Sequence, residues 1–183
     1  MKEYPEVEVH LVMEDRELDL AQREADLAIR MRAPVQADLI QRKLFTVHYH
    51  MYATKTYLEK YGTPQTLDEL ADHTIIAYGE TAAPEIREIN WLLEQTRRRL
   101  SGKGRTVRIN NVPGILCATD ASVGIAAVPD YVAAERPHLA RVLPDVPGPS
   151  FDVHLVYADA LRQSKRVAAF RDFLVRASKG WRH

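Results

Sequence analysis

The 183-residue sequence has one cysteine, no net charge and no long apolar run, and each absence excludes a class of protein. The single cysteine, Cys117, cannot form a disulfide within the chain, which favours a reducing compartment. With 25 basic and 25 acidic residues, the chain has no overall field that draws it to nucleic acid or to a membrane. No apolar run approaches the roughly 20 residues of a membrane helix, and no secretion signal is visible. We expect a cytoplasmic globular protein.

Motifs that carry catalytic chemistry are also missing. The sequence has no G-x-S-x-G elbow, C-x-x-C pair, G-x-G-x-x-G loop or Walker loop. His48 and His50 share one face of a predicted strand, but two ligands do not make a metal site. Cys117 is predicted on the apolar side of a helix, where a thiol is usually inert. We therefore expect no metal, no cofactor and no enzymatic activity.

The basic run from Arg97 to Arg105 is the only candidate for phosphate contacts. It has no interleaved aromatic residue for base stacking, and the chain as a whole is neutral. We interpret it as a solvated loop.

Apolar spacing predicts an α/β fold in which strands and helices alternate. Short joints between these elements favour a parallel sheet with helical crossovers. The segment 85–105 is left unassigned. Residues 38–54 are predicted to form either two consecutive strands or one long bent strand. Further strands are predicted over 7–11, 25–31, 74–79, 106–111, 124–129, 139–145 and 151–158, and helices over 15–24, 55–62, 63–73, 112–122, 130–137 and 164–180.

The first strand has an unusual context. Val7, Val9 and Leu11 alternate with polar residues, which predicts a strand with one buried face. Residues 2–5 before it look like the last turn of a helix ended by a proline. The sequence thus opens at the tail of a helix whose body it does not contain.

Ligands of open parallel sheets bind beyond the carboxyl ends of the strands, where the next helices begin. Three predicted strand ends carry candidates for such a site: Arg30 and Met31, Asn110 and Asn111, and Val128 and Pro129. Either asparagine is a suitable N-cap for the following helix, whose free amides can hold an anion. Arg30 can grip a carboxylate across a cleft, or Arg30 and Arg32 can each form an ion pair with an acidic residue at the surface. The residues alone leave both alternatives open.

Taken together, six stretches resemble the effector-binding domain of LysR-type transcriptional regulators in order and spacing. The match runs from Tyr4 to about Ala177, and the stretches are YPEVEVHL, DLAIRM, DLIQRKL, YATKTYLEKYGTPQTLDELADHTII, INNVPGILCATDASVGIAAVPDYVA and AAFRDFLVRA. The resemblance implies a fold like that of type II periplasmic binding proteins. Such a fold has two Rossmann-like subdomains joined by two crossing segments, with a small-molecule effector in the cleft between them.

The family pattern also implies boundaries, site residues and partners. Residues 1–51 with 153–183 would form one subdomain, and residues 52–152 the other. The effector, an anionic or aromatic metabolite, would contact the six candidates above together with Met13 and Glu14. The implied regulator is a homo-oligomer that binds DNA only through a helix-turn-helix domain outside this chain, and it has no membrane partner. Effector binding would shift the population of its conformations.

Two departures from the family pattern matter. Ser122 stands where the family usually has a glycine. The effector pocket of the family draws on the first helix of the first subdomain, and this subdomain looks as if it lacks its first β-α unit, so we expect low or absent effector affinity. We also expect the incomplete subdomain either to be patched by a partner chain or to be mobile. A periplasmic solute-binding protein of the same fold, and an enzyme on a related fold, are the alternatives.

Overall fold

The chain divides into two units, Met1–Thr46 with Phe151–Arg182, and Val47–Ser150. This computed structural model describes residues 4, 5, 7–13, 17–34, 36–79, 88–100 and 105–179, with the backbone alone at 98–100. The functional boundaries expected at residues 51/52 and 152/153 stay a prediction. Each unit is described by itself below.

The second unit contains a mixed sheet. Its strands are β3 (Thr74–Tyr78), β4 (Arg105–Ile109), β5 (Ile125–Pro129), β6 (Leu139–Val142) and the second half of β2 (Leu39–Thr54). β3 pairs in parallel with β4 and β5, whereas β2 pairs antiparallel with β5 and β6. The parallel sheet expected from the sequence is confirmed for β3, β4 and β5 only.

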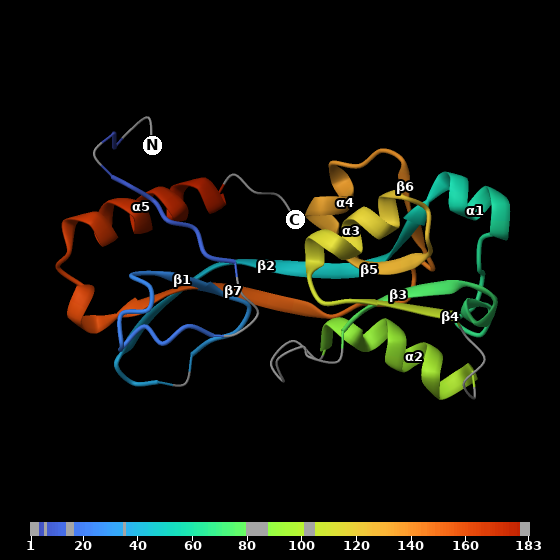
Figure 1. Ribbon diagram of the computed structural model, residues 1–183, viewed down its shortest axis with the longest axis horizontal. Helices are drawn as coiled ribbons and strands as arrows, with labels where there is room; N and C mark the ends of the chain where they lie inside the picture. The colour runs from blue at the N-terminus through green and yellow to red at the C-terminus, as the bar shows by residue number, and fades with distance from the viewer. Residues whose placement is uncertain are drawn as a thin grey trace. The chain divides into compact units, whose positions relative to one another are not determined.

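Helices flank these strands on both sides (Figure 1). α3 and α4 lie on one side, and α2 lies on the other. Thr54 caps α1, because its side-chain oxygen accepts a hydrogen bond from the amide of Tyr57. The helices are α1 (Lys55–Tyr61), α2 (Trp91–Leu100), α3 (Val112–Asp120) and α4 (Asp130–Ala134), with a 3-10 turn at Glu69–Asp72.

One apolar cluster of the second unit joins β2, β3 and β5 to α1 and α2. The inward face of β2 meets the centres of β3 and β5, and α1 and α2 close over them. Because β3 and β5 lie inside the sheet and are covered by helices, their residues are apolar almost without alternation. The buried members are Met51, Ala53, Tyr57, Leu58, Leu70, Ile75, Leu92, Ile125, Val142 and Leu143.

In its described residues, the first unit has fewer strands than the second. β7 (Ser150–Ala158) lies between β1 (Ala28–Arg30) and the first half of β2, and it pairs antiparallel with β1. A 3-10 turn (Asp159–Leu161) then leads to α5 (Lys165–Lys179). The sequence predicts one apolar face for α5, yet only Val167 among its apolar residues is fully buried. Phe173 is 38% exposed.

Several predicted elements are absent or shorter. The strand expected over 7–11 is wrong, because residues 7–13 have no strand partner among the described residues. The helix expected over 15–24 shrinks to turns in its described part, residues 17–24, and that over 63–73 to the 3-10 turn. The strand expected over 25–31 keeps only Ala28–Arg30. Cys117 is exposed rather than buried. The supposed loop over 97–105 begins as helix α2 and ends in β4, with 101–104 outside the described residues.

Candidate functional site

The carboxyl ends of β3 and β4 lie side by side in the second unit. Tyr78 is in register with Ile109, and the amide of Gly79 donates to the carbonyl of Ile109 at 3.0 Å. A Cβ on Gly79 would lie 3.6 Å from Asn110. Since β5 is also parallel to β3, all three carboxyl ends meet at one edge of the sheet. This edge is the place where α/β proteins bind ligands.

Asn110 and Asn111 lie at this edge, at the start of α3. The side-chain oxygen of Asn111 accepts a hydrogen bond from the amide of Gly114 at 2.7 Å, so Asn111 is the N-cap. This confirms that an asparagine caps the helix. The Asn111 side-chain amide also donates to the side-chain oxygen of Asn110 at 3.1 Å. Both residues are exposed, so their remaining hydrogen-bonding groups are accessible from solvent.

Val128 and Pro129 end β5 at the same edge, but both are buried. They pair with His50 and Tyr49 of β2. Their side chains therefore pack within the unit, and their contact with an effector stays a prediction.

An Asp–His–Tyr group follows Pro129. His50 Nδ1 lies 2.7 and 2.9 Å from the two carboxylate oxygens of Asp130, and the Tyr52 hydroxyl donates to Asp130 at 3.0 Å. Burial and the nearby Asp130 charge raise the pKa of Tyr52 to about 12. Sequence inspection missed this group because Asp130 lies 80 residues from His50 in the chain.

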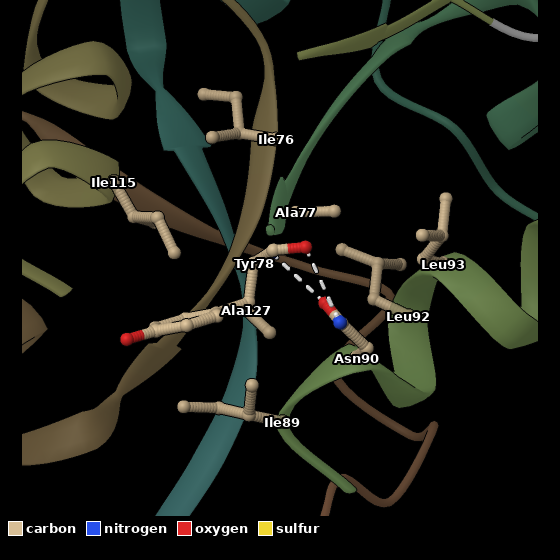
Figure 2. A pocket seen from close by; sticks show the side chains of 9 residues that line it. All are labelled: Ile76, Ala77, Tyr78, Ile89, Asn90, Leu92, Leu93, Ile115 and Ala127. Carbon is tan, nitrogen blue, oxygen red and sulfur yellow. Dashed lines mark hydrogen bonds between the residues drawn. The ribbon is translucent and has the colours of Figure 1, made fainter. Parts of the chain in front are cut away.

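A small cavity lies behind the end of β3 (Figure 2). Its volume is about 10 Å³, which is room for one water molecule at most. Beside it, the Asn90 side chain accepts a hydrogen bond from the amide of Tyr78 at 2.9 Å and donates to the carbonyl of Tyr78 at 3.3 Å. These two hydrogen bonds hold the start of α2 against β3. The lining residues are Ile76, Ala77, Tyr78, Ile89, Asn90, Leu92, Leu93, Ile115 and Ala127.

In the first unit, Arg30 is buried and already has partners. Its Nη2 donates to the carbonyl of Leu18 at 2.9 Å, and its Nη1 lies 3.4 Å from the Glu17 carboxylate. Arg32 contacts the same carboxylate at 3.0 Å. Glu17 therefore binds both arginines, which is the ion-pair alternative that the sequence left open. A carboxylate-gripping role for Arg30 stays a prediction.

The other predicted effector contacts of the first unit differ in exposure. Met31 is half-buried in a bend after β1. Met13 is 82% exposed, and Glu14 lies outside the described residues.

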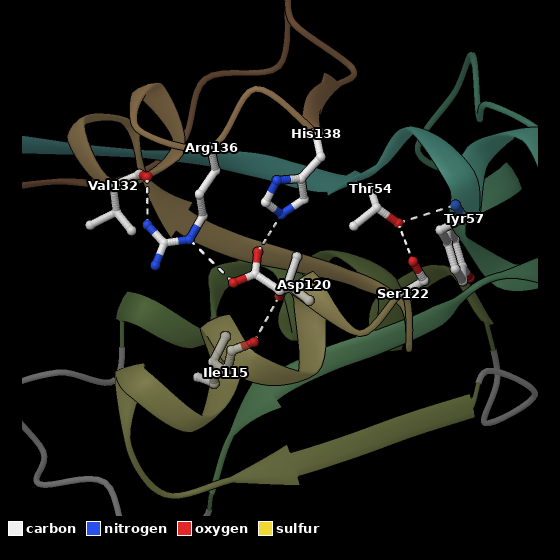
Figure 3. Close-up of polar contacts among 9 residues, drawn as sticks. Thr54, Tyr57, Ile115, Asp120, Ser122, Val132, Arg136 and His138 are labelled. Atoms are coloured by element: carbon white, nitrogen blue, oxygen red, sulfur yellow. Dashed lines mark hydrogen bonds and ion pairs between the residues drawn. The ribbon is translucent and has the colours of Figure 1, made fainter.

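A second polar network lies at the opposite end of α3 (Figure 3). Asp120 accepts from His138 Nε2 at 2.7 Å and from Arg136 Nε at 3.3 Å. Burial raises the pKa of Asp120, but these two hydrogen bonds and the accompanying charges outweigh it and hold the pKa below its ordinary value. Nearby, the hydroxyls of Thr54 and Ser122 are hydrogen-bonded.

Metal and membrane sites find no support in the described part of the chain. No three His, Cys, Asp or Glu side chains there are grouped so that they could hold a metal ion. None of the helices described is both long and apolar enough to cross a membrane.

Comparison with known proteins identifies the class. The family model of the LysR substrate binding domain matches residues 1–179, so the chain belongs to that family. An HTH-type transcriptional regulator of Xanthomonas campestris is 30% identical over 185 residues, covering 94% of this chain and 52% of the relative. The probable HTH-type transcriptional regulator LtrA of Klebsiella pneumoniae is 31% identical, covering 93% and 56%. The chain spans about half the length of these curated relatives.

Solved structures show the same fold. The regulatory domain of CrgA from Neisseria meningitidis, a LysR-type transcriptional regulator, superposes with a TM-score of 0.77 at 23% identity. That superposition covers 96% of this chain and 86% of the CrgA chain. The regulatory domain of AphB from Vibrio vulnificus gives a TM-score of 0.72 at 22% identity, covering 97% and 87%. The α/β fold of the periplasmic-binding-protein type expected from the sequence is confirmed.

Proposed function

We propose that this chain senses a small-molecule effector for a LysR-type regulator of transcription. The observation that carries the proposal is the family match over residues 1–179, with curated relatives that are transcriptional regulators rather than enzymes. The match favours this function over a periplasmic solute-binding protein. On this proposal the chain makes and breaks no bond, works in the cytoplasm in an oligomer, and reaches DNA through a helix-turn-helix domain outside residues 1–183.

The geometry of the second unit supports an anionic effector. Asn110 and Asn111 offer exposed side-chain amides beside the first turn of α3. The N-terminus of a nine-residue helix carries partial positive charge and favours a carboxylate or phosphate. Exposed Tyr131, near the start of α4, would suit an aromatic ring beside that anion.

The remaining candidates contribute differently. Val128 and Pro129 would act by holding the edge in shape, because they are buried. Arg30, Met31, Met13 and Glu14 stay predicted effector contacts of the first unit. The cleft between subdomains expected from the sequence also stays a prediction.

The proposed mechanism is a shift between conformations. An effector changes the regulator only if it binds one conformation more tightly than another, and the size of the shift is set by that difference. Coupling energies of this kind are about 1–3 kcal/mol, roughly a five- to 150-fold change in affinity for the coupled ligand.

The test is a thermal-shift and calorimetric screen of residues 1–183 with benzoate, succinate, inorganic phosphate and uncharged glucose. We expect at least one anion to bind and glucose not to bind. Asn110→Ala should weaken binding of that anion by about 1.5–3 kcal/mol, the scale of one hydrogen bond to a charged group. Lys60→Ala, at an exposed position of α1, is the control. Binding of glucose alone would contradict the anionic class.

A further inference from the structure

The Asp130 carboxylate joins the start of α4 to β2. Nδ1 of His50 donates to its two oxygens at 2.7 and 2.9 Å, and the hydroxyl of Tyr52 donates to it at 3.0 Å. A carboxylate only accepts hydrogen bonds, so the hydrogen of the His50 ring lies on Nδ1. α4 has only five residues, and a helix of this length is not stable without contacts to its surroundings. These hydrogen bonds therefore help to set the orientation of its first turn.

Tyr131 directly follows Asp130 and is the exposed member of three neighbouring tyrosines. Tyr49 pairs with Pro129 at the end of β5, and Tyr78 ends β3. Burial raises the pKa of Tyr49, and the nearby Tyr131 and Tyr78 raise it further, which agrees with three phenol rings gathered at one edge of the sheet. Tyr49 is 2% exposed and Tyr78 3%, whereas Tyr131 is 39% exposed. Among the three, Tyr131 is the ring that a ligand can reach.

α3 begins at the same edge, with Asn110 and Asn111 before its first turn. α3 and α4 lie on the same side of the sheet (Figure 1). Because the side chains of a helix lean toward its N-terminus, Tyr131 leans toward the edge where both helices begin. β4 and β5 both pair with β3, so their ends lie about 10 Å apart, a span that an aromatic acid bridges with its contacts. An acid bound at α3 can therefore place its ring against Tyr131, and paired rings attract each other beyond the effect of burial.

We propose that Tyr131 makes the effector site selective for aromatic carboxylic acids, and that Asp130, held by His50 and Tyr52, positions Tyr131. This inference rests on the proposed function and names the ligand class of the same site. Tyr131 contacts the ligand, whereas the other three are positioning residues. Without their hydrogen bonds the first turn of α4 can move and carry the Tyr131 ring with it, while the first turn of α3 stays in place. All of these residues belong to the second unit.

Calorimetry with benzoate and cyclohexanecarboxylate tests the selectivity. The two acids have the same charge and a similar size, so the ratio of their affinities separates the aromatic ring from the anion. We expect residues 1–183 to bind benzoate more tightly by at least about threefold, the scale of one aromatic pair. Tyr131→Ala should bring the ratio close to one, and Tyr131→Phe should preserve it because the ring remains. Equal affinities in the wild type overturn the proposal.

The same ratio tests the positioning residues. Asp130→Asn replaces an acceptor oxygen with a donor, and Tyr52→Phe removes one hydroxyl without changing the ring. We expect each to lower the ratio at least twofold. Asp120→Asn is the matched control, because Asp120 also accepts from a histidine, His138, at 2.7 Å, but at the far end of α3. It should leave the ratio unchanged. A loss that is equal for both acids in Asp130→Asn would show a merely structural role and overturn the positioning.

Fluorine NMR provides a measurement without any ligand. In protein labelled with 3-fluorotyrosine, the Tyr131 signal is assigned by its disappearance in Tyr131→Phe. We expect Asp130→Asn to move this signal toward that of free fluorotyrosine, and Asp120→Asn to leave it in place. A signal that Asp130→Asn does not move overturns the positioning.

The binding results also separate this inference from the proposed function. Binding of succinate or phosphate without binding of benzoate would overturn the aromatic selectivity and leave the anionic site intact. Failure of benzoate, succinate and phosphate alike would contradict the proposed anionic site, and the selectivity of Tyr131 would be overturned with it.

Discussion

The hydroxyl of Ser122 is hydrogen-bonded to the hydroxyl of Thr54 at 2.5 Å, across 68 residues of chain. Ser122 follows the end of α3 with φ +59°, in the left-handed region. Its amide donates to Thr119, and the amide of Val123 donates to Ala118, which together form a Schellman cap. Glycine is favoured at this position of the cap because it has no Cβ, so Ser122 adopts this conformation at a cost in backbone strain.

Two substitutions separate the strain of Ser122 from its hydrogen bond. Ser122→Ala keeps the left-handed Cβ and removes the hydroxyl, so we expect a loss of about 1 kcal/mol in the free energy of unfolding. Ser122→Gly also removes the hydroxyl but relieves about 1 kcal/mol of backbone strain, so it should be nearly neutral. Urea unfolding followed by circular dichroism measures both. Equal losses in the two variants would contradict the assigned strain.

Gly148 is required by a close approach of two backbones. A Cβ at this position would lie 1.7 Å from the carbonyl oxygen of Tyr49, and neither backbone can move without disturbing the Tyr49–Pro149 hydrogen bond. We expect Gly148→Ala to cost about 3 kcal/mol or more, or to prevent folding. Gly79→Ala is the matched control, because its Cβ would meet only ordinary contacts at 3.6 Å. It should change stability by less than about 1 kcal/mol. Comparable urea midpoints for the two variants would show that the Gly148 and Tyr49 backbones are not as close as the structure places them.

His73 makes the stability of the second unit depend on pH. Its ring is buried against Tyr57, and burial lowers its pKa below the ordinary value near 6.5. The unfolded chain therefore binds the proton more readily, so stability is complete above about pH 6.5 and is lost as the pH falls through the lower folded value. We expect urea midpoints to fall between about pH 7.5 and pH 5.5, and to fall less in His73→Gln. His48→Gln, at an exposed position, should keep the full decrease. Parallel pH profiles for wild type and His73→Gln would assign the effect elsewhere.

The Asp120–His138–Arg136 network should contribute little. All three side chains are partly exposed, and ion pairs of this kind are worth about 0–1 kcal/mol each. We expect Asp120→Asn to cost at most about 1 kcal/mol near pH 7, and the cost to shrink in about 1 M NaCl. Because the Asp120 pKa is lowered on folding, its contribution is present above about pH 4 and is lost as the pH falls through the folded value. A loss of stability that is large and independent of salt would show instead that Asp120 acts as a buried ion-pair partner.

Local sequence signals predicted much of the second unit. The apolar runs of β3 and β5 and the cap of α3 at Asn111 depend on residues that are neighbours in the chain. Such signals carry over into structure because strand burial and helix capping are decided locally. Asn110 and Asn111 were accordingly predicted at the strand edge where the structure places them.

Contacts between distant segments could not be predicted. The alternation over Val7–Leu11 is a sound strand pattern, but a strand also needs a partner, and the described chain provides none. Arg30 was predicted at the end of a strand, but its burial against Glu17 and Leu18 depends on how the preceding turns fold back. The Tyr78–Asn90 hydrogen bonds and the His50–Asp130 hydrogen bonds join residues that no sequence pattern links.

The two hydrogen bonds of the Asn90 side chain have a consequence for deamidation of the protein. An asparagine amide imitates a peptide group, so its oxygen and nitrogen serve the amide and the carbonyl of Tyr78 together. Spontaneous loss of ammonia would turn this side chain into a carboxylate, which only accepts hydrogen bonds. The carbonyl of Tyr78 would then face a negative oxygen in a largely apolar place. One such hydrolysis would therefore loosen α2 from β3 while the rest of the sequence stayed intact.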